Sequence, residues 1–307
     1  PRWLTEGIST WEEMDFDLQY DEMIRNALYN GRLPDLFSMN EGFMQQKYQG
    51  QMAVSYYQSA LFSKFYVDKY GFDSLRQAIT LMANKDCVES LAQVAGAESS
   101  VLNEGFQVFQ KQWIDSIPWP LTLDEENVEN FSASVVAAMS DDDFELYLSG
   151  LLKSGADAEA EKLIRGRADY LGRGLEVLGH FQMRQGDREE AYKYFDESLV
   201  LGREGFINNY YLGLKALEDK DDEKARKLIS KAQQLYPRFT SKNKKLNPYE
   251  LLIGLEKGEK AIAFAKKQSE LNAKLFSAAV TYGDLLNDSG QKALAIEAYE
   301  QANEINP

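Results

Sequence analysis

Hydrophobic side chains recur every three to four residues along most of the chain, which is the spacing of amphipathic helices. In the first third, a broad apolar stripe that includes Tyr57, Leu61 and Phe65 predicts one long helix. This helix is expected to end at Gly71, because glycine commonly follows the last turn of a helix. Residues 31–50 mix turn formers without a clean period and indicate a long connection. No convincing strand alternation interrupts this part, so we expect it to be helical.

An internal repeat of 34 residues dominates the chain beyond about residue 140. Four pairs of residues at equivalent positions of the repeat lie 34 residues apart: Gly179 and Gly213, Ala191 and Ala225, Tyr249 and Gly283, and Ala261 and Ala295. Each unit has the pattern of two helices, with small residues where the helices must approach closely. This is the tetratricopeptide (TPR) pattern, whose helix pairs stack into a solenoid because one pair cannot bury its apolar face alone. We expect four to five repeats, with a concave face that binds a peptide or protein partner.

A break in composition falls at Ile117-Pro118-Trp119-Pro120. Two prolines at alternate positions end a helix and favour extended chain. We therefore predict an all-α protein with a helical domain at 1–117, a linker and first helix at 118–139, and a TPR solenoid at 140–307.

The composition narrows the functions that the chain can have. The 307 residues include 34 basic and 49 acidic side chains, for a net charge of −15, so we expect no nucleic-acid partner, because its phosphates would be repelled. No apolar run approaches the length of a membrane span. The single cysteine, Cys87, excludes an internal disulfide and is expected to be a buried small hydrophobe. The single histidine, His180, excludes a two-histidine zinc site built from this chain alone.

The first residues of the chain carry a helical motif with a carboxylate, Trp3-Leu4-Thr5-Glu6-Gly7-Ile8-Ser9. Glu6 falls near the face of Trp3, where a carboxylate needs a partner, since burying it unpaired is costly. One interpretation is a solvated or ion-paired glutamate, and the other is a metal ligand. The stretch resembles the Trp-Leu-x-Glu-Gly-x-Ala motif of gluzincin-type zinc metallopeptidases of the peptidase MA group. The resemblance extends over about residues 1–114, and many members of that group carry TPR repeats after the peptidase domain.

The resemblance implies specific roles and also shows what is missing. In such enzymes the motif follows an H-E-x-x-H helix by about two dozen residues and supplies the third zinc ligand, which would be Glu6 here. Tyr56 or Tyr57 would then be the candidate that stabilises an oxyanion. Ser9 stands where alanine is usual, and Trp11 where tyrosine is common. Because no H-E-x-x-H occurs in the chain, it should hold no zinc and hydrolyse no peptide by itself; zinc is expected only in a parent protein with that motif.

The repeats supply a second set of candidate site residues. Some TPR domains clamp a carboxylate with Lys and Asn at the fifth and ninth positions of the repeat, but this chain has other residues there, so that mode of binding is not expected. We interpret these positions as partner contacts on the concave face: Glu176, His180, Tyr210, Leu214 and Asp284. The basic run at 241–245 is expected to be a solvated loop, and the three aspartates at 141–143 should begin a helix, whose dipole they complement.

Two hypotheses of different classes remain. In the first, the chain is a piece of a zinc metallopeptidase, beginning abruptly at Pro1, with its H-E-x-x-H upstream and its repeats recruiting a substrate or partner. In the second, it is a non-enzymatic TPR scaffold with a degenerate peptidase-like domain. Members of the resembled family are often bacterial and exported, so the resemblance points to an extracytoplasmic, periplasmic location. An H-E-x-x-H encoded upstream would favour the first hypothesis.

Overall fold

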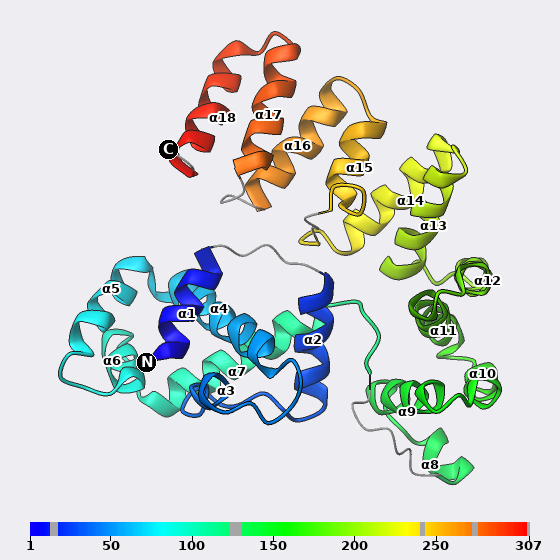
Figure 1. Ribbon diagram of the computed structural model, residues 1–307, viewed down its shortest axis with the longest axis horizontal. Coiled ribbons are helices and arrows are strands. Elements are labelled where there is room, and N and C mark those ends of the chain that lie inside the picture. The colour runs from blue at the N-terminus through cyan, green and yellow to red at the C-terminus, as the bar shows by residue number, and fades with distance from the viewer. Residues whose placement is uncertain (13–17, 123–130, 240–242, 272–275, 306–307) are drawn as a thin grey trace. The chain divides into compact units, whose positions relative to one another are not determined.

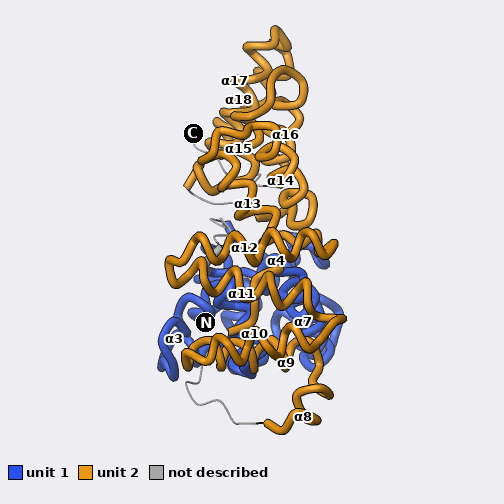
Figure 2. Tube along the Cα trace, turned by 90° about the vertical axis from the view of Figure 1, so that its right-hand side faces the viewer, with its two compact units in different colours: residues 1–14, 19–117 blue, residues 15–18, 118–307 orange. Residues whose placement is uncertain are grey.

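The computed structural model describes residues 1–12, 18–122, 131–239, 243–271 and 276–305. Over these residues it contains helices and no strand, which confirms the all-α fold class (Figure 1). The chain folds into two compact units, residues 1–14 with 19–117 and residues 118–307 with 15–18 (Figure 2). None of the described helices is both long and apolar enough to cross a membrane.

The first unit is built around one long central helix, α4. Its helices are α1 (Arg2–Glu12), α2 (Leu18–Tyr29), α3 (Glu41–Met44), α4 (Gln51–Tyr70), α5 (Phe72–Leu81), α6 (Cys87–Val94) and α7 (Ser99–Asp115). As expected, α4 ends at Tyr70, and Gly71 follows with a φ of 85°, a conformation that glycine adopts without steric cost. The long connection predicted at 31–50 is present, with only the short helix α3 inside it.

Burial around most of the circumference of α4 makes it the core of the first unit. An aromatic cluster surrounds Phe62: the ring of Trp3 from α1 meets it edge-on at 5.1 Å, and that of Phe106 from α7 does so at 5.2 Å. Gly7 allows α1 to lie directly on α4, since a Cβ there would come within 2.6 Å of the carbonyl oxygen of Ser59. Cys87, at the start of α6, is buried as expected, and burial raises its pKa to about 12.

The second unit is a succession of helix pairs. After α8 (Ala133–Ala137) the pairs are α9 (Asp141–Lys153) with α10 (Asp157–Gly166), α11 (Leu171–Gln185) with α12 (Arg188–Val200), α13 (Phe206–Glu218) with α14 (Asp222–Leu235), α15 (Pro248–Leu255) with α16 (Glu259–Leu271), and α17 (Phe276–Asp288) with α18 (Lys292–Ile305). Consecutive pairs pack on each other through α10 and α11, α12 and α13, α14 and α15, and α16 and α17. The unit is therefore extended one pair at a time.

The 34-residue period corresponds to repeated packing positions. A Cβ on Gly179 would overlap the ring of Phe195, and the equivalent contact 34 residues on is between Gly213 and Ile229. Gly283 has the same relation to the ring of Tyr299 in the last pair. In each case glycine in the first helix makes room for a large side chain of the second helix. The small residues seen in the sequence therefore mark the close crossings within the helix pairs.

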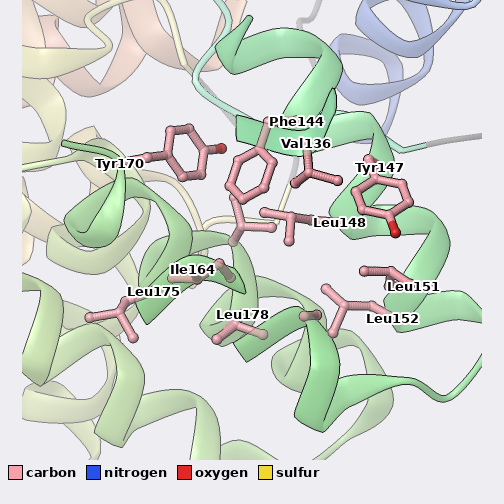
Figure 3. Packing of buried hydrophobic residues seen from close by; sticks show 12 residues of the cluster. Val136, Phe144, Tyr147, Leu148, Leu151, Leu152, Ile164, Tyr170, Leu175 and Leu178 are labelled. Carbon is pink, nitrogen blue, oxygen red and sulfur yellow. The ribbon is translucent and has the colours of Figure 1, made fainter. Parts of the chain in front are cut away.

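An apolar cluster from α8 to α11 forms the beginning of the second unit (Figure 3). Phe144 and Tyr170 meet edge-on at 5.1 Å in this cluster. The aspartates at 141–143 lie in the first turn of α9, as predicted, and the hydroxyl of Ser140 caps the helix by accepting from the Asp143 N–H. Of the basic run at 241–245, residues 241 and 242 lie outside the described residues, so its loop character is only partly visible.

Candidate functional site

The motif on α1 places Glu6 at a partly open surface of the first unit. Its side chain is 32% exposed and forms an ion pair with Arg2, with Nε and Oε1 3.4 Å apart. The hydrogen bond between Arg2 and Tyr56 is the main cause that raises the Arg2 pKa, and the bond to Glu6 adds to it. The Tyr56 ring packs edge-on against Phe43 at 5.1 Å. The structure therefore links Glu6 to Tyr56 through one arginine, and Glu6 is ion-paired.

Tyr57 points into a different environment from Tyr56. It is buried, and its hydroxyl donates to Oδ1 of Asp21 at 2.5 Å and accepts from Nε1 of Trp113 at 3.2 Å. Because the phenolic proton is engaged by a buried carboxylate, this placement argues against an oxyanion role for Tyr57. An oxyanion role for Tyr56 stays a prediction.

Asp21 is fully buried in α2, and the sequence reasoning missed it. The sequence feature that could have revealed its burial is its spacing from Ile24 and Ala27, which puts the aspartate on the apolar face of its helix. An acidic residue at such a position indicates a buried hydrogen-bond partner, which is here Tyr57.

In the second unit, the segment predicted to be a linker is packed. We call residues Pro118–Leu121 the strap. The carbonyl oxygen of Pro118 accepts from Nη1 of Arg173 at 3.1 Å, and the amide of Leu121 donates to Oε1 of Glu145 at 2.6 Å. The indole of Trp119 is fully buried. The contacts of the strap come largely from first helices of successive pairs, namely α9, α11 and α13.

Trp119 is surrounded by rings. His180 of α11 lies 5.4 Å from it, centroid to centroid, Phe206 at the start of α13 lies edge-on at 5.3 Å, and Phe239 after α14 lies at 6.1 Å. We call the strap site the set of residues that contact the strap: Glu145, Arg173, His180, Phe206 and Phe239. Burial lowers the pKa of His180 to about 3, and the charges of Arg184 and Arg173 lower it further against the opposing effect of Glu145.

A buried ionic network supports the strap site. Arg173 makes a two-pronged contact with Glu145, with nitrogen–oxygen distances of 3.0 Å, and the hydroxyl of Tyr170 donates to the same carboxylate at 2.7 Å. Burial alone would raise the Glu145 pKa, but the charge and hydrogen bonds of Arg173, with those from Tyr170 and the Leu121 amide, lower it overall. Arg173 also contacts Glu176 at 3.2 Å, and the two carboxylates raise its own pKa despite its burial.

Three of the five residues predicted to contact a partner are buried in this structure. Glu176 is fully buried in the ionic network, where Arg203 also contacts it at 3.4 Å. His180 is buried under Trp119. Tyr210 is buried against Phe206 and Phe239, and its hydroxyl donates to the carbonyl oxygen of Leu246.

Of the other two, Leu214 is half-buried, and Asp284 is exposed. Asp284 accepts a hydrogen bond from the hydroxyl of Tyr299 at 2.8 Å. The structure therefore places His180 against the strap and Glu176 beside Arg173, which contacts the strap, while Asp284 belongs to the last helix pair. The 34-residue pattern located the positions correctly within their helices but did not show that other parts of the chain cover them.

Among the described residues, no three His, Cys, Asp or Glu side chains come together as a metal-binding group. Glu6 is therefore one carboxylate without further ligands in this part of the chain. Since the one histidine is buried in the second unit, the residues present do not fit a zinc site by themselves.

Comparisons with known proteins bear on the first unit. The family model described as "Peptidase MA superfamily" matches residues 1–112. No match is found among curated proteins. Among solved structures, the chain described as "MamA RS-1 ArsTM double mutant" is 21% identical over 55% of this chain and 96% of its own, with a TM-score of 0.35, which is too low to support an argument about function. Residues 1–112 are therefore similar to the peptidase MA superfamily over the part of the chain that carries the motif on α1.

Proposed function

We propose that the chain joins the C-terminal part of a zinc metallopeptidase domain to a TPR module that binds a protein or peptide partner. The observation that carries the first half is the match of residues 1–112 to the peptidase MA superfamily, together with the packing of the Trp3–Gly7 motif against α4. The second half is supported by helix pairs whose close crossings repeat every 34 residues, at the small positions typical of TPR units.

In this proposal Glu6 is one ligand of a zinc ion whose two histidines come from an H-E-x-x-H helix of the parent protein. The carboxylate is suited to that task because it lies at a partly open surface and its present partner, Arg2, is itself half exposed. Solvent screens an exposed ion pair and leaves it weak, so a metal can displace the arginine at little cost. Because this chain supplies no further ligand to the site, we derive no catalytic step from it.

The test is zinc content and peptide hydrolysis in the protein encoded by the full gene. We expect stoichiometric zinc by atomic emission spectroscopy and hydrolysis of a casein substrate. Both should be lost in Glu6→Gln, because the amide lacks the charge that a zinc ligand provides. Glu12→Gln, at the other end of the same helix, is the matched control and should keep both. Zinc bound equally by Glu6→Gln and the wild type would remove Glu6 from the site.

The second candidate function is a scaffold without catalysis, which the repeated helix pairs of the second unit support equally well. A scaffold predicts that the full gene encodes no H-E-x-x-H. It also predicts that partner binding by the repeats is unchanged after treatment with a chelator. The two functions therefore differ in the zinc measurement, while both retain the binding role of the repeats.

A further inference from the structure

The strap occupies the side of the helix pairs through which a repeat module of this kind contacts a ligand. Its contacts come from the first helix of three successive pairs, through Glu145, Arg173, His180 and Phe206, with Phe239 closing over the indole. In stacked helical repeats, the first helices line the extended binding surface. Of the residues expected from sequence to meet a partner, His180 contacts the strap, and Glu176 binds Arg173, which contacts the strap.

The way the strap is held matches the recognition of an extended peptide. Arg173 binds a backbone carbonyl oxygen, and Glu145 binds a backbone amide three residues later. Both interactions use groups that any peptide has, so they provide affinity without selecting a sequence. The side chain that is selected is Trp119, which fills an aromatic pocket, and the prolines on both sides of it favour the extended backbone. Arg173 and Glu145 are held in position by their mutual contact.

The fit of the strap is incomplete at the polar atoms of the pocket. His180 is more than nine-tenths buried, and neither Nδ1 nor Nε2 has a hydrogen-bond partner among the described residues; the same is true of Nε1 of Trp119. Buried polar groups are almost always paired, because losing water without a replacement is costly. An incoming peptide with a donor or acceptor beside its aromatic side chain would satisfy His180, which the strap does not.

We propose that the strap site is a peptide-binding site whose resident ligand is the chain's own Pro118–Leu121, and that a partner binds by replacing it. The partner presents an extended segment with a bulky aromatic side chain next to proline. This inference rests on the proposed binding role of the repeats and names the surface and the ligand class for it. Only molecules in which the strap is displaced can bind the partner, so the apparent affinity equals the intrinsic affinity multiplied by the fraction of such molecules.

The test is binding of a fluorescein-labelled peptide with the sequence of residues 116–122, Ser-Ile-Pro-Trp-Pro-Leu-Thr, to the full chain, followed by anisotropy. Trp119→Ala removes the anchor of the strap and leaves its pocket for the indole of the peptide. We expect this variant to bind the peptide at least tenfold more tightly than the wild type does. Leu121→Pro removes the amide donor and replaces a buried leucine but keeps Trp119 as the anchor, so it should give a smaller gain. A peptide with Ala in place of Trp should bind none of the three proteins.

A second measurement on the wild type does not depend on any variant folding. Pro118 and Pro120 have no amide, so hydrogen exchange within the strap reports only on Trp119 and Leu121. With saturating peptide, we expect exchange in this segment to become several times faster, because the Leu121 amide leaves Glu145. Equal peptide affinity for the wild type and a folded Trp119→Ala, or exchange that the bound peptide does not change, would overturn the proposal.

Two further outcomes separate this proposal from its alternatives. A wild-type dimer that Trp119→Ala abolishes would assign the site to the strap of a second copy and overturn the partner proposed here. If a protein partner binds the wild type and Trp119→Ala equally well, the repeats are a binding module that uses another surface; the proposed function then stands and this inference fails.

Discussion

Burial of the single histidine gives this protein a specific sensitivity to acid. The folded-state pKa of His180 is about 3, against an ordinary value of 6.5, because the imidazole has lost water under Trp119 and faces the positive charges of Arg184 and Arg173, with Glu145 opposing them. The unfolded chain therefore takes up a proton as the pH falls below 6.5, and the folded chain does not. The contribution of His180 to stability is therefore full above pH 6.5, declines as the pH falls, and is lost by about pH 3.

The magnitude follows from the size of the pKa shift. Each unit is worth about 1.4 kcal/mol, so the loss from this residue is about 2 kcal/mol at pH 5 and approaches 5 kcal/mol near pH 3. The assay is urea unfolding, followed by circular dichroism at pH 7.5, 6 and 5, of the wild type and His180→Leu. Because no other histidine is present, a pH dependence that only the wild type shows in this range belongs to His180.

Nuclear magnetic resonance supplies the direct check. The imidazole signals of the folded wild type should not titrate between pH 8 and 5. In Trp119→Ala they should titrate at a higher pH than in the wild type, because water reaches the ring once the indole is gone. Parallel stability curves for the wild type and His180→Leu, or a native midpoint near 6.5, would refute the reasoning.

Two further predictions concern packing and charge. Gly7→Ala should lower the free energy of unfolding by about 1–3 kcal/mol, because the new Cβ meets the backbone of Ser59. The control is Gly254→Ala: Gly254 is a helical glycine with open space around it, so this change should be neutral or stabilising by up to about 1 kcal/mol. Chemical denaturation of both variants measures the difference. Arg173→Met should lower the free energy of unfolding by about 3–5 kcal/mol in the same assay, since it leaves buried carboxylates unpaired. Adding Glu145→Gln to this variant should recover part of that loss. Equal losses in the single and double variants would show that the ion pair is not the cause.

Local features of this protein could be predicted because they depend on residues close in sequence. The three-to-four-residue spacing of apolar positions determines which face of α4 is buried, and Gly71 ends that helix through a backbone conformation of its own. The 34-residue period located Gly179 and Gly213 at the close crossings of their helix pairs, because only small residues allow two backbones to approach there. Of the two interpretations of Glu6, the structure shows the ion-paired one, with Arg2 one helical turn away as its partner.

The features that sequence reasoning missed all involve residues distant in the chain. Tyr57 lies in a different environment from its neighbour Tyr56, because its hydroxyl donates to Asp21, 36 positions away in sequence. Glu145 and Arg173 form a buried pair across 28 positions. A periodic pattern identifies the side of a helix that faces inward, but it does not identify the group that lies opposite, so a buried acid and its partner are recognised only once both are placed in space.

The repeats show most clearly which features follow from local sequence and which depend on contacts between distant residues. The sequence by itself determined that the second half consists of helix pairs and that Glu176 and His180 lie on the first helices. Only the tertiary structure decided that these residues are covered. Arg173, Arg203 and the start of α13 surround Glu176. His180 is covered by Pro118–Leu121, a segment that has no periodicity and whose two prolines suggested only a boundary. Helix periodicity comes from neighbouring residues along the chain, whereas the packing of Trp119 against His180 is a tertiary contact across 61 positions of sequence, stabilised by burial of aromatic surface and not encoded in any local pattern.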